Sequence, residues 1–273
     1  MRNFWKDKVV LITGSTRGIG LELAKQLLRK DAVVIFHSYK SNLPEELVIN
    51  QAFIHNRALF VRADVRSGAE VNQMIELVLK KFSRLDVLIN NAGISSVGLI
   101  EEINDYTMRS VIDTNLYGPL LVTRASIPAL KKSKGSICMI SSLSAHYGIP
   151  NYITYSIAKS ALIPLQQGLS IELNKFGINV SAIILGFTEN DKQKYALNAS
   201  GEEVLIPIRN KTIQISQTNA ARKIIKAIQN KKRIIYTGFS GIIYSVMVKF
   251  TPSLVRIIQQ RTFEKKNLIN SND

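Results

Sequence analysis

The chain has 273 residues, of which 46% are hydrophobic and 21% charged, and its 36 Lys and Arg against 20 Asp and Glu give a net charge of +16. This length suits one large domain or two small ones, and this apolar fraction excludes disorder as the main state of the chain. The excess of positive charge leaves nucleic acid and an anionic membrane surface open as partners.

Cysteine and histidine are scarce, which limits the chemistry that the chain can support. The single cysteine, Cys138, excludes an intrachain disulfide and suits a reducing compartment. None of the histidines, His37, His55 and His146, has the spacing of metal ligands, so we expect no metal site. The N-terminus lacks the apolar core of a signal peptide, and no uninterrupted apolar run reaches the roughly 18 residues of a membrane span. We therefore expect a cytoplasmic protein.

Short runs rich in β-branched residues alternate with longer segments of helical periodicity as far as about residue 237. The expected strands are Val9–Thr13, Val33–Phe36, Leu59–Ala63, Val87–Asn90, Ser136–Ile140, Asn179–Ile184 and Arg233–Thr237. The expected helices are Ile19–Lys30, Glu70–Phe82, Tyr106–Lys131, Tyr152–Phe176 and Asn219–Asn230. This alternation predicts a doubly wound α/β domain with a seven-stranded parallel sheet and helices on both faces.

Two segments break the alternation. Phe187–Ser216 is polar and irregular, and we expect a mobile loop over a site there. Phe239–Lys266 has the pattern of one or two helices interrupted at Pro252. We therefore divide the chain into a domain over residues 1–238 and a basic, amphipathic helical extension over residues 239–273.

Glycines cluster where the first strand meets the first helix, at Gly14, Gly18 and Gly20. Glycine lets the backbone turn tightly beside a pyrophosphate, and the helix N-terminus offers N–H groups and partial positive charge. The order strand, glycines, helix favours a dinucleotide site over an ordinary turn that happens to need glycine. The loop and helix start supply the expected contacts Gly14, Ser15, Arg17, Gly18, Ile19 and Gly20.

The end of the second expected strand indicates which dinucleotide binds. An acidic residue there would hold the ribose 2′-hydroxyl of NAD, but the sequence after Phe36 is His37, Ser38, Tyr39 and Lys40. Arg17 and Lys40 are cations that suit a 2′-phosphate, with Ser38 beside them, so we expect NADP(H) in preference to NAD(H). The alternative is that Lys40 is only a solvated surface charge.

A tyrosine and a lysine share one face of a predicted helix, since Tyr155 and Lys159 are four residues apart. Ser142 lies just past the fifth expected strand, at the sheet edge where ligands bind in such folds. An ammonium group close to a phenol lowers the phenol pKa, so the pair can transfer a proton while a hydride moves. Without this context, such a pair usually lies on the surface.

Together these motifs resemble the classical short-chain dehydrogenase/reductase family over about residues 7–237. The matching motifs are the glycine loop, the segment Asn90-Asn91-Ala92-Gly93, Asp64-Val65, Asp113-Thr114-Asn115, Ser142, and Tyr155 with Lys159. The resemblance implies a Rossmann fold and an enzyme that interconverts a carbonyl and a secondary alcohol. It also implies an oligomer, a homodimer or homotetramer, in which two long helices pair across subunits.

The resemblance assigns roles by position. Tyr155 would be the acid/base, Lys159 would bind the nicotinamide ribose and lower the Tyr155 pKa, Ser142 would orient the substrate, and Asn115 would hold a water that links Lys159 to solvent. Ser141 and Ser144 are rivals of Ser142. The remaining implied cofactor contacts are Asp64 and Val65 at the adenine, Asn90, Asn91, Ala92 and Gly93 near the ribose, and Gly186 and Thr188 near the nicotinamide.

The sequence departs from the family after the sixth expected strand. Leu185 stands before Gly186 where the family has proline, and Asn190 stands where a threonine is usual. Thr188 still offers backbone and hydroxyl groups to the nicotinamide carboxamide. The change puts the detail of that contact in doubt and leaves the chemistry as expected.

The C-terminal stretch concentrates the positive charge. Residues 222–273 hold eleven Lys or Arg against two acids, which is +9 of the chain's +16. After Pro252, apolar residues alternate with Arg256, Arg261, Lys265 and Lys266 in the pattern of a basic amphipathic helix. Three interpretations stay open: packing on the domain as a lid over the pocket, packing on a partner subunit, and peripheral contact with an anionic membrane.

The expected function is therefore NADP-dependent oxidoreduction of a small carbonyl or alcohol. Relatives with similar C-terminal helices act on lipophilic carbonyls, so the resemblance implies a steroid-like or acyl-chain substrate. The alternative is a catalytically silent nucleotide-binding scaffold or sensor that acts through its tail on a membrane or partner. No nucleic-acid recognition module occurs, so we expect no nucleic-acid partner.

Overall fold

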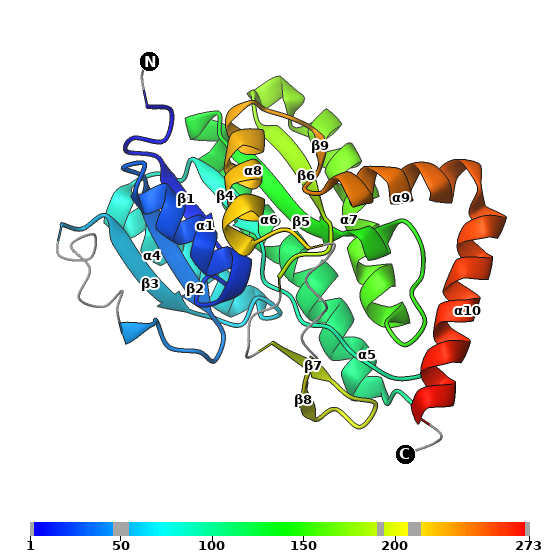
Figure 1. Ribbon diagram of the computed structural model, residues 1–273. Coiled ribbons are helices and arrows are strands. Elements are labelled where there is room, and N and C mark those ends of the chain that lie inside the picture. The colour runs from blue at the N-terminus through cyan, green and yellow to red at the C-terminus, as the bar shows by residue number, and fades with distance from the viewer. Residues whose placement is uncertain (1–2, 46–54, 190–193, 207–213, 271–273) are drawn as a thin grey trace.

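A seven-stranded parallel sheet forms the centre of the molecule (Figure 1). The computed structural model describes residues 3–45, 55–189, 194–206 and 214–270. In spatial order the strands are β3 (Ala58–Arg62), β2 (Val33–Ser38), β1 (Val9–Ile12), β4 (Val87–Asn90), β5 (Ser136–Ser142), β6 (Asn179–Leu185) and β9 (Ile234–Tyr236). Every neighbouring pair is parallel. The order reverses between β1 and β4, and such a reversal is where doubly wound sheets bind ligands.

Helices cover both faces of this sheet. The helices of the domain are α1 (Gly18–Leu28), α4 (Gly68–Phe82), α5 (Asp105–Ile112), α6 (Gly118–Ser133), α7 (Ile153–Glu172) and α8 (Gln217–Gln229). Val10 and Ile12 of β1 pack with α1 and α8 in one apolar core, whereas Val9 and Leu11 pack with α4, α6 and α7 in the other. This alternation along β1 explains why the central strands are apolar throughout.

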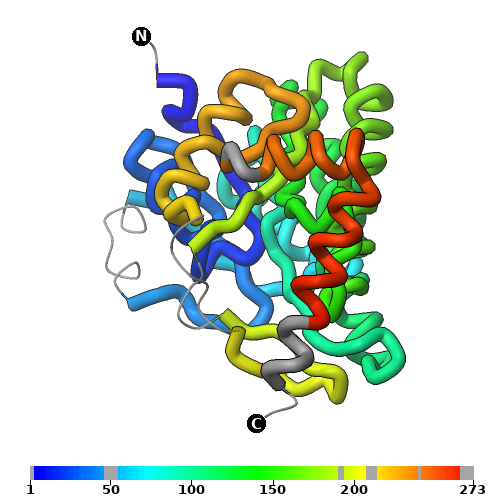
Figure 2. Tube along the Cα trace, turned by 45° about the vertical axis from the view of Figure 1, so that its right-hand side comes forward, coloured from blue at the N-terminus to red at the C-terminus, as the bar shows by residue number. Residues whose placement is uncertain are grey.

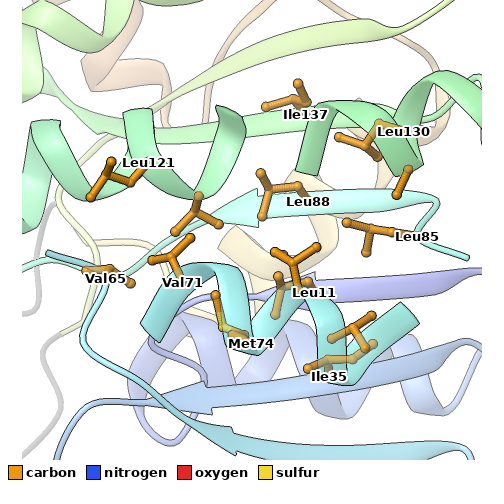
Figure 3. Packing of buried hydrophobic residues seen from close by; sticks show 14 of the residues in the cluster. Leu11, Ile35, Val65, Val71, Met74, Leu85, Leu88, Leu121, Leu130 and Ile137 are labelled. Carbon is orange, nitrogen blue, oxygen red and sulfur yellow. The ribbon is translucent and has the colours of Figure 1, made fainter. Parts of the chain in front are cut away.

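The second core lies between the sheet and helices α4 and α6 (Figure 3). Leu11, Leu88 and Ile137 reach it from three strands, and Met74 and Leu121 reach it from the two helices. All of these side chains are buried. The predicted Rossmann fold is therefore confirmed.

Two expected elements are wrong in detail. The expected helix Tyr106–Lys131 is divided by a π-helical turn, Asp113–Tyr117, between α5 and α6. The expected irregular segment Phe187–Ser216 contains an antiparallel pair, β7 (Tyr195–Leu197) and β8 (Glu203–Leu205). Gly201, at φ +92, turns the chain between these two strands, and an L side chain there would be strained. Residues 190–193 and 207–213 of this segment lie outside the described residues.

Beyond β9, the chain forms two helices, α9 (Phe239–Phe250) and α10 (Pro252–Asn270), as the interruption at Pro252 predicts. Helix α9 runs away from the sheet edge, and α10 turns down along that side of the molecule (Figure 1, Figure 2). Among the described residues, no single helix has the length and hydropathy of a membrane span. Gly241–Phe250 and Pro252–Glu264 pass that test only as a pair, across a bend of 116°.

Candidate active site

A buried histidine anchors the glycine loop. Nδ1 of His37, at the end of β2, accepts a hydrogen bond of 3.0 Å from the Gly14 N–H, and its Nε2 lies 3.0 Å from the Ala63 carbonyl oxygen. Ser15 Oγ in turn accepts from the His37 N–H at 2.9 Å. Burial lowers the pKa of His37 to about 4. The ring is therefore neutral at pH 7, with Nε2 donating to Ala63.

The residue pattern did not indicate this role of His37. In the sequence, this position indicates only that the acidic residue typical of an NAD site is missing at the end of the second strand. The only sequence feature that could have indicated this role is a histidine at the end of a buried strand that is expected to lie next to the glycine loop.

The start of α1 is open to an anion. Arg17 is the N-cap residue, no side chain caps the helix, and no acidic residue occupies its first turn. Gly14 and Gly18 adopt φ values of +63 and +57. A Cβ at Gly18 would meet nothing within 4 Å, so the loop faces open space at this point. A helix N-terminus with no side-chain cap and no acidic residue in its first turn, beside open space at Gly18, fits a dinucleotide pyrophosphate.

The glycine loop is tied to the segment Asn90–Gly93 at the end of β4. Thr13 Oγ1 accepts from the N–H groups of Asn91 and Ala92 at 3.0 and 2.9 Å. Asn91 Nδ2 donates to the carbonyl oxygens of Thr13 and Gly14 at 2.9 and 2.8 Å. A Cβ at Gly14 would lie 2.8 Å from Ala92 Cα, so only glycine allows this approach. Asn91 and Ala92 thus position the loop through Thr13, a positioning residue that was not among the predicted cofactor contacts.

At the expected adenine end, Asp64 is engaged by a neighbour. Its carboxylate accepts two hydrogen bonds of 2.9 Å from Arg66 Nε and one of 2.6 Å from Arg66 Nη2. Partial burial raises the pKa of Asp64, but the hydrogen bonds from Arg66 outweigh burial and leave that pKa below its usual value. Val65 is buried beneath α6, where a Cβ at Gly118 would lie 2.8 Å from Val65 Cγ2.

Two cations, Arg66 and Lys40, lie at this end of the site. The Arg66 guanidinium lies 5.2 Å from the centre of the Tyr39 ring, and Lys40 Nζ lies 5.7 Å from it. Lys40 also forms a long, exposed ion pair of 3.9 Å with Glu203 of β8. Lys40 therefore lies at the expected end of the site, and Arg66 is a further cation that was not among the predicted cofactor contacts. Its signal was its position directly after Asp64-Val65.

The π-helical turn places Asn115 in the interior. Asn115 is fully buried, and its Nδ2 donates to the carbonyl oxygens of Ile94 and Val111 at 2.7 and 2.8 Å. Its Oδ1 has no hydrogen-bond partner in the described part of the chain. A Cβ at Gly93 would lie 2.5 Å from Asn115 Oδ1 and 3.3 Å from Lys159 Nζ. Because Gly93 has no side chain, it leaves room for Asn115 and Lys159 to approach one another.

Lys159 projects from α7 toward the end of β5. Its Nζ donates to the Ile140 carbonyl oxygen at 3.0 Å and lies 5.7 Å from the centre of the Tyr155 ring. Burial, with a smaller effect of Lys194, lowers the pKa of Lys159 to about 8. A buried lysine that keeps its charge at pH 7 beside a phenol can stabilise the phenolate form. The structure therefore brings Asn115, Tyr155 and Lys159 together as expected.

The three candidate serines have different surroundings. Ser141 is buried, and its hydroxyl donates to the Lys159 carbonyl oxygen at 2.8 Å. Ser144 is also buried. Ser142 is only half-buried, and its Oγ accepts a weak hydrogen bond of 3.3 Å from the Ser144 N–H. Ser142 therefore has the most accessible hydroxyl of the three.

After β6, Gly186 is held by Thr237, the residue that follows β9, and Thr188 is held by Gly186. The Gly186 N–H donates to Thr237 Oγ1 at 3.0 Å, and Thr188 Oγ1 donates to the Gly186 carbonyl oxygen at 3.1 Å. Leu185 ends β6 and packs on the first apolar core, so the chain turns here without proline. Asn190 lies outside the described residues.

An apolar cavity of about 540 Å³ opens between the C-terminal helix and the loops at the carboxyl ends of β4 and β5. Its lining residues include Leu99, Ile100, Pro150, Ile153 and Phe263. Ile153 precedes Tyr155 by two residues, and Phe263 belongs to α10. The extension therefore contributes a wall to a cavity close to the catalytic helix.

Comparison with known proteins identifies the family. A family model described as short chain dehydrogenase matches residues 8–200 of this chain. The chain belongs to the short-chain dehydrogenase family. It is accordingly an oxidoreductase that acts on CH–OH groups, binds a nicotinamide dinucleotide and takes a small-molecule substrate, in a family whose members commonly oligomerise.

Several curated relatives and solved structures are similar. An 11-beta-hydroxysteroid dehydrogenase A of Sesamum indicum is 30% identical over 236 residues, which cover 84% of this chain and 67% of the relative. A 3-oxoacyl-[acyl-carrier-protein] reductase of Synechocystis is 34% identical over 200 residues, covering 72% of this chain and 80% of that protein. The structure of a short-chain dehydrogenase from Streptomyces avermitilis has a TM-score of 0.77 at 24% identity, over 98% of this chain and 99% of that one, and so supports the fold alone.

Proposed function

We propose that this short-chain dehydrogenase uses NADP(H) to interconvert a ketone and a secondary alcohol on a lipophilic small molecule. The observation that carries the proposal is the cluster of Tyr155, Lys159 and Asn115, which converges behind Gly93 next to an open glycine loop. A protein that only bound nucleotide would need no buried ammonium beside a phenol.

Each residue of the cluster has a role in proton transfer. In the reducing direction, the Tyr155 hydroxyl gives its proton to the carbonyl oxygen of the substrate, and in the oxidising direction the phenolate takes it back. The nicotinamide supplies or accepts the hydride. The Lys159 ammonium stabilises the phenolate that forms, and Asn115 Oδ1 is an unused acceptor for a water that returns a proton to Lys159. Ser142, with its accessible hydroxyl, donates a hydrogen bond to the carbonyl.

The preference for NADP(H) is proposed from charge. Among the described residues, β2 ends at His37 and Ser38 without an acidic residue, and Lys40 and Arg66 lie beside the Tyr39 ring that follows this strand. Arg17, the N-cap of α1, adds a cation in the glycine loop. A 2′-phosphate adds about two negative charges, which Arg and Lys bind strongly. We expect kcat/KM for NADPH to exceed that for NADH by at least tenfold. The double variant Lys40→Ala/Arg66→Ala should lose that ratio, whereas the single variant Arg222→Ala, at an exposed position of α8, should keep it.

The lipophilic substrate is proposed from the cavity and from the relatives. The cavity beside Phe263 is lined mainly by apolar side chains. A steroid-like or acyl-chain compound would bury its apolar surface there. The names of the similar proteins, a hydroxysteroid dehydrogenase and a 3-oxoacyl reductase, point to the same two substrate classes.

The organisation of the molecule belongs to the same proposal. Residues 1–238 form the catalytic domain and residues 239–273 an appended extension, and the protein works in the cytoplasm with membrane contact through α9 and α10. A homodimer or homotetramer would form through an apolar groove of about 330 Å³ on α6 and α7, lined by residues such as Leu120, Ile127 and Leu165. Tyr117 and Leu120 expose apolar surface at this groove.

The test is the variant Tyr155→Phe, assayed against a panel of ketones and alcohols of graded lipophilicity. Loss of the proton donor should lower kcat by roughly 10²- to 10⁴-fold, while NADPH binding, followed by its fluorescence, persists. Tyr106→Phe is the matched control, because Tyr106 is exposed on α5 and should leave turnover unchanged. Tyr155→Phe with wild-type turnover would refute the mechanism, and a wild type that binds NADPH but turns over nothing in the panel would favour the silent scaffold.

A further inference from the structure

Helix α9 carries a continuous apolar stripe that faces solvent. Ile242, Val246 and Phe250 recur every four residues, Ile243 lies between them, and Phe250 is 70% exposed. The opposite side of the helix packs inward, because Gly241 touches Leu143. An apolar stripe on the solvent side of a helix needs a partner that the monomer does not supply.

Helix α10 has two different faces. Val255 is buried and Phe263 lines the cavity, so the face that repeats through these positions turns inward. Gln259, on the same face, donates from Nε2 to the Tyr244 hydroxyl of α9 at 3.3 Å and joins the two helices. Leu254, Ile257 and Ile258 lie on the outward face and are all exposed. One face of α10 therefore lines the cavity while the other extends the apolar surface of α9.

These seven side chains form the densest group of exposed large hydrophobic residues in the described part of the chain. Residues 239–264 hold seven of the eighteen exposed large hydrophobic side chains of the described residues, although they make up about a tenth of the sequence. We call them the α9–α10 apolar surface: Ile242, Ile243, Val246, Phe250, Leu254, Ile257 and Ile258. Among the described residues, neither helix is both long and apolar enough to cross a bilayer by itself, and a bend of 116° separates them.

The charges around this surface select its partner. Lys249 lies at the edge of the stripe, and Arg261 continues it one turn beyond Ile257 and Ile258. The only acidic residue in residues 239–264 is Glu264. Basic side chains that border an apolar face are complementary to a lipid surface with anionic headgroups. A second copy of the chain fits less well, since a symmetric contact would bring these cations together in a protein of net charge +16.

We propose that the α9–α10 apolar surface docks the protein on anionic membranes, with the two helices lying in the interface and Lys249 and Arg261 among the headgroups. The docking itself does not depend on catalysis. It would place the cavity behind Phe263 beside the lipid, which suits a lipophilic substrate and in that respect rests on the proposed function.

The experiment is flotation of the full chain with vesicles of phosphatidylcholine alone and of phosphatidylcholine mixed with phosphatidylglycerol. The wild type should float with the mixed vesicles, far less with phosphatidylcholine alone, and less at high salt. Val246→Glu/Leu254→Glu should lower partitioning more than tenfold. Lys249→Ala/Arg261→Ala should lower partitioning into the mixed vesicles by roughly 30-fold, since each cation near the surface contributes about fivefold.

The matched control is Ile171→Glu, because Ile171 is an exposed apolar residue at the end of α7, away from the α9–α10 apolar surface. It should float as the wild type does, and thermal unfolding checks that every variant is folded. Flotation of Val246→Glu/Leu254→Glu equal to that of the wild type would overturn the proposal. An oligomer that this variant loses, in a wild type that ignores both vesicles, would assign the surface to a second copy. Neither result bears on turnover, which Tyr155→Phe tests separately.

Discussion

Replacement of His37 by glutamine tests how the glycine loop is held. His37 Nδ1 accepts from the Gly14 N–H, and a proton on Nδ1 would remove that acceptor. The ring is buried, so water cannot replace the lost bond. Glutamine keeps one acceptor and one donor but does not titrate. His37→Gln therefore distinguishes the contribution of the hydrogen bonds to stability from the effect of protonating the ring.

The size of the effect follows from the pKa. Burial lowers the pKa of His37 from 6.5 to about 4 in the folded protein. Between these two values the unfolded chain binds the proton and the folded chain does not, so stability falls as the pH falls from about 6.5 to about 4. At about 1.4 kcal/mol for each pKa unit, the loss is about 3 kcal/mol, and it levels off once both states are protonated.

The assay is urea unfolding of the wild type and of His37→Gln at a series of pH values from neutral to acidic. Asp86, whose pKa is lowered, and His146, whose pKa burial lowers, titrate in both proteins and cancel in the difference between the two curves. The difference therefore reports His37 together with its electrostatic interaction with Asp64. That difference should shrink by about 3 kcal/mol as the pH falls through this window. His55→Gln, at an exposed position, should run parallel to the wild type. A His37→Gln curve parallel to the wild type would refute the reasoning.

Two further predictions concern the gap at Gly93 and the groove on α6 and α7. Gly93→Ala should lower kcat by roughly 100-fold in steady-state kinetics, because its Cβ would lie 2.5 Å from Asn115 Oδ1 and displace the catalytic side chains. Gly168→Ala is the control, because Gly168 is exposed on α7 and a Cβ there would meet nothing within 4 Å. A wild-type kcat for Gly93→Ala would contradict this prediction. Leu120→Glu should reduce the mass measured by light scattering to that of a monomer, since it puts a charge in the apolar groove. Leu77→Glu, on the exposed side of α4, is the control and should leave the mass as in the wild type. If Leu120→Glu also kept the wild-type mass, the proposed interface would be wrong.

The strands and the main helices could be predicted because local patterns decide them. A strand such as β1 is apolar at every position since both its faces are covered, and the amphipathic period of α4 shows which side it buries. The spacing of Tyr155 and Lys159 places both on one helical face before any packing is known. The break at Pro252 between the two last helices was also local, because proline cannot continue the hydrogen-bond ladder.

Only the tertiary structure decided the contacts between distant segments. The π-helical turn at Asn115 and the hairpin of β7 and β8 depend on what packs against them, and no period in the sequence marks them. The pairing of Arg66 with Asp64 also needed side-chain geometry. The role of His37 also became visible only in the tertiary structure, where its neutral ring bonds Gly14 after β1 and Ala63 after β3. Composition alone determined that the chain is strongly basic. Only the folded structure shows where this charge borders an exposed apolar surface, because the burial of a side chain depends on residues that are distant in the sequence.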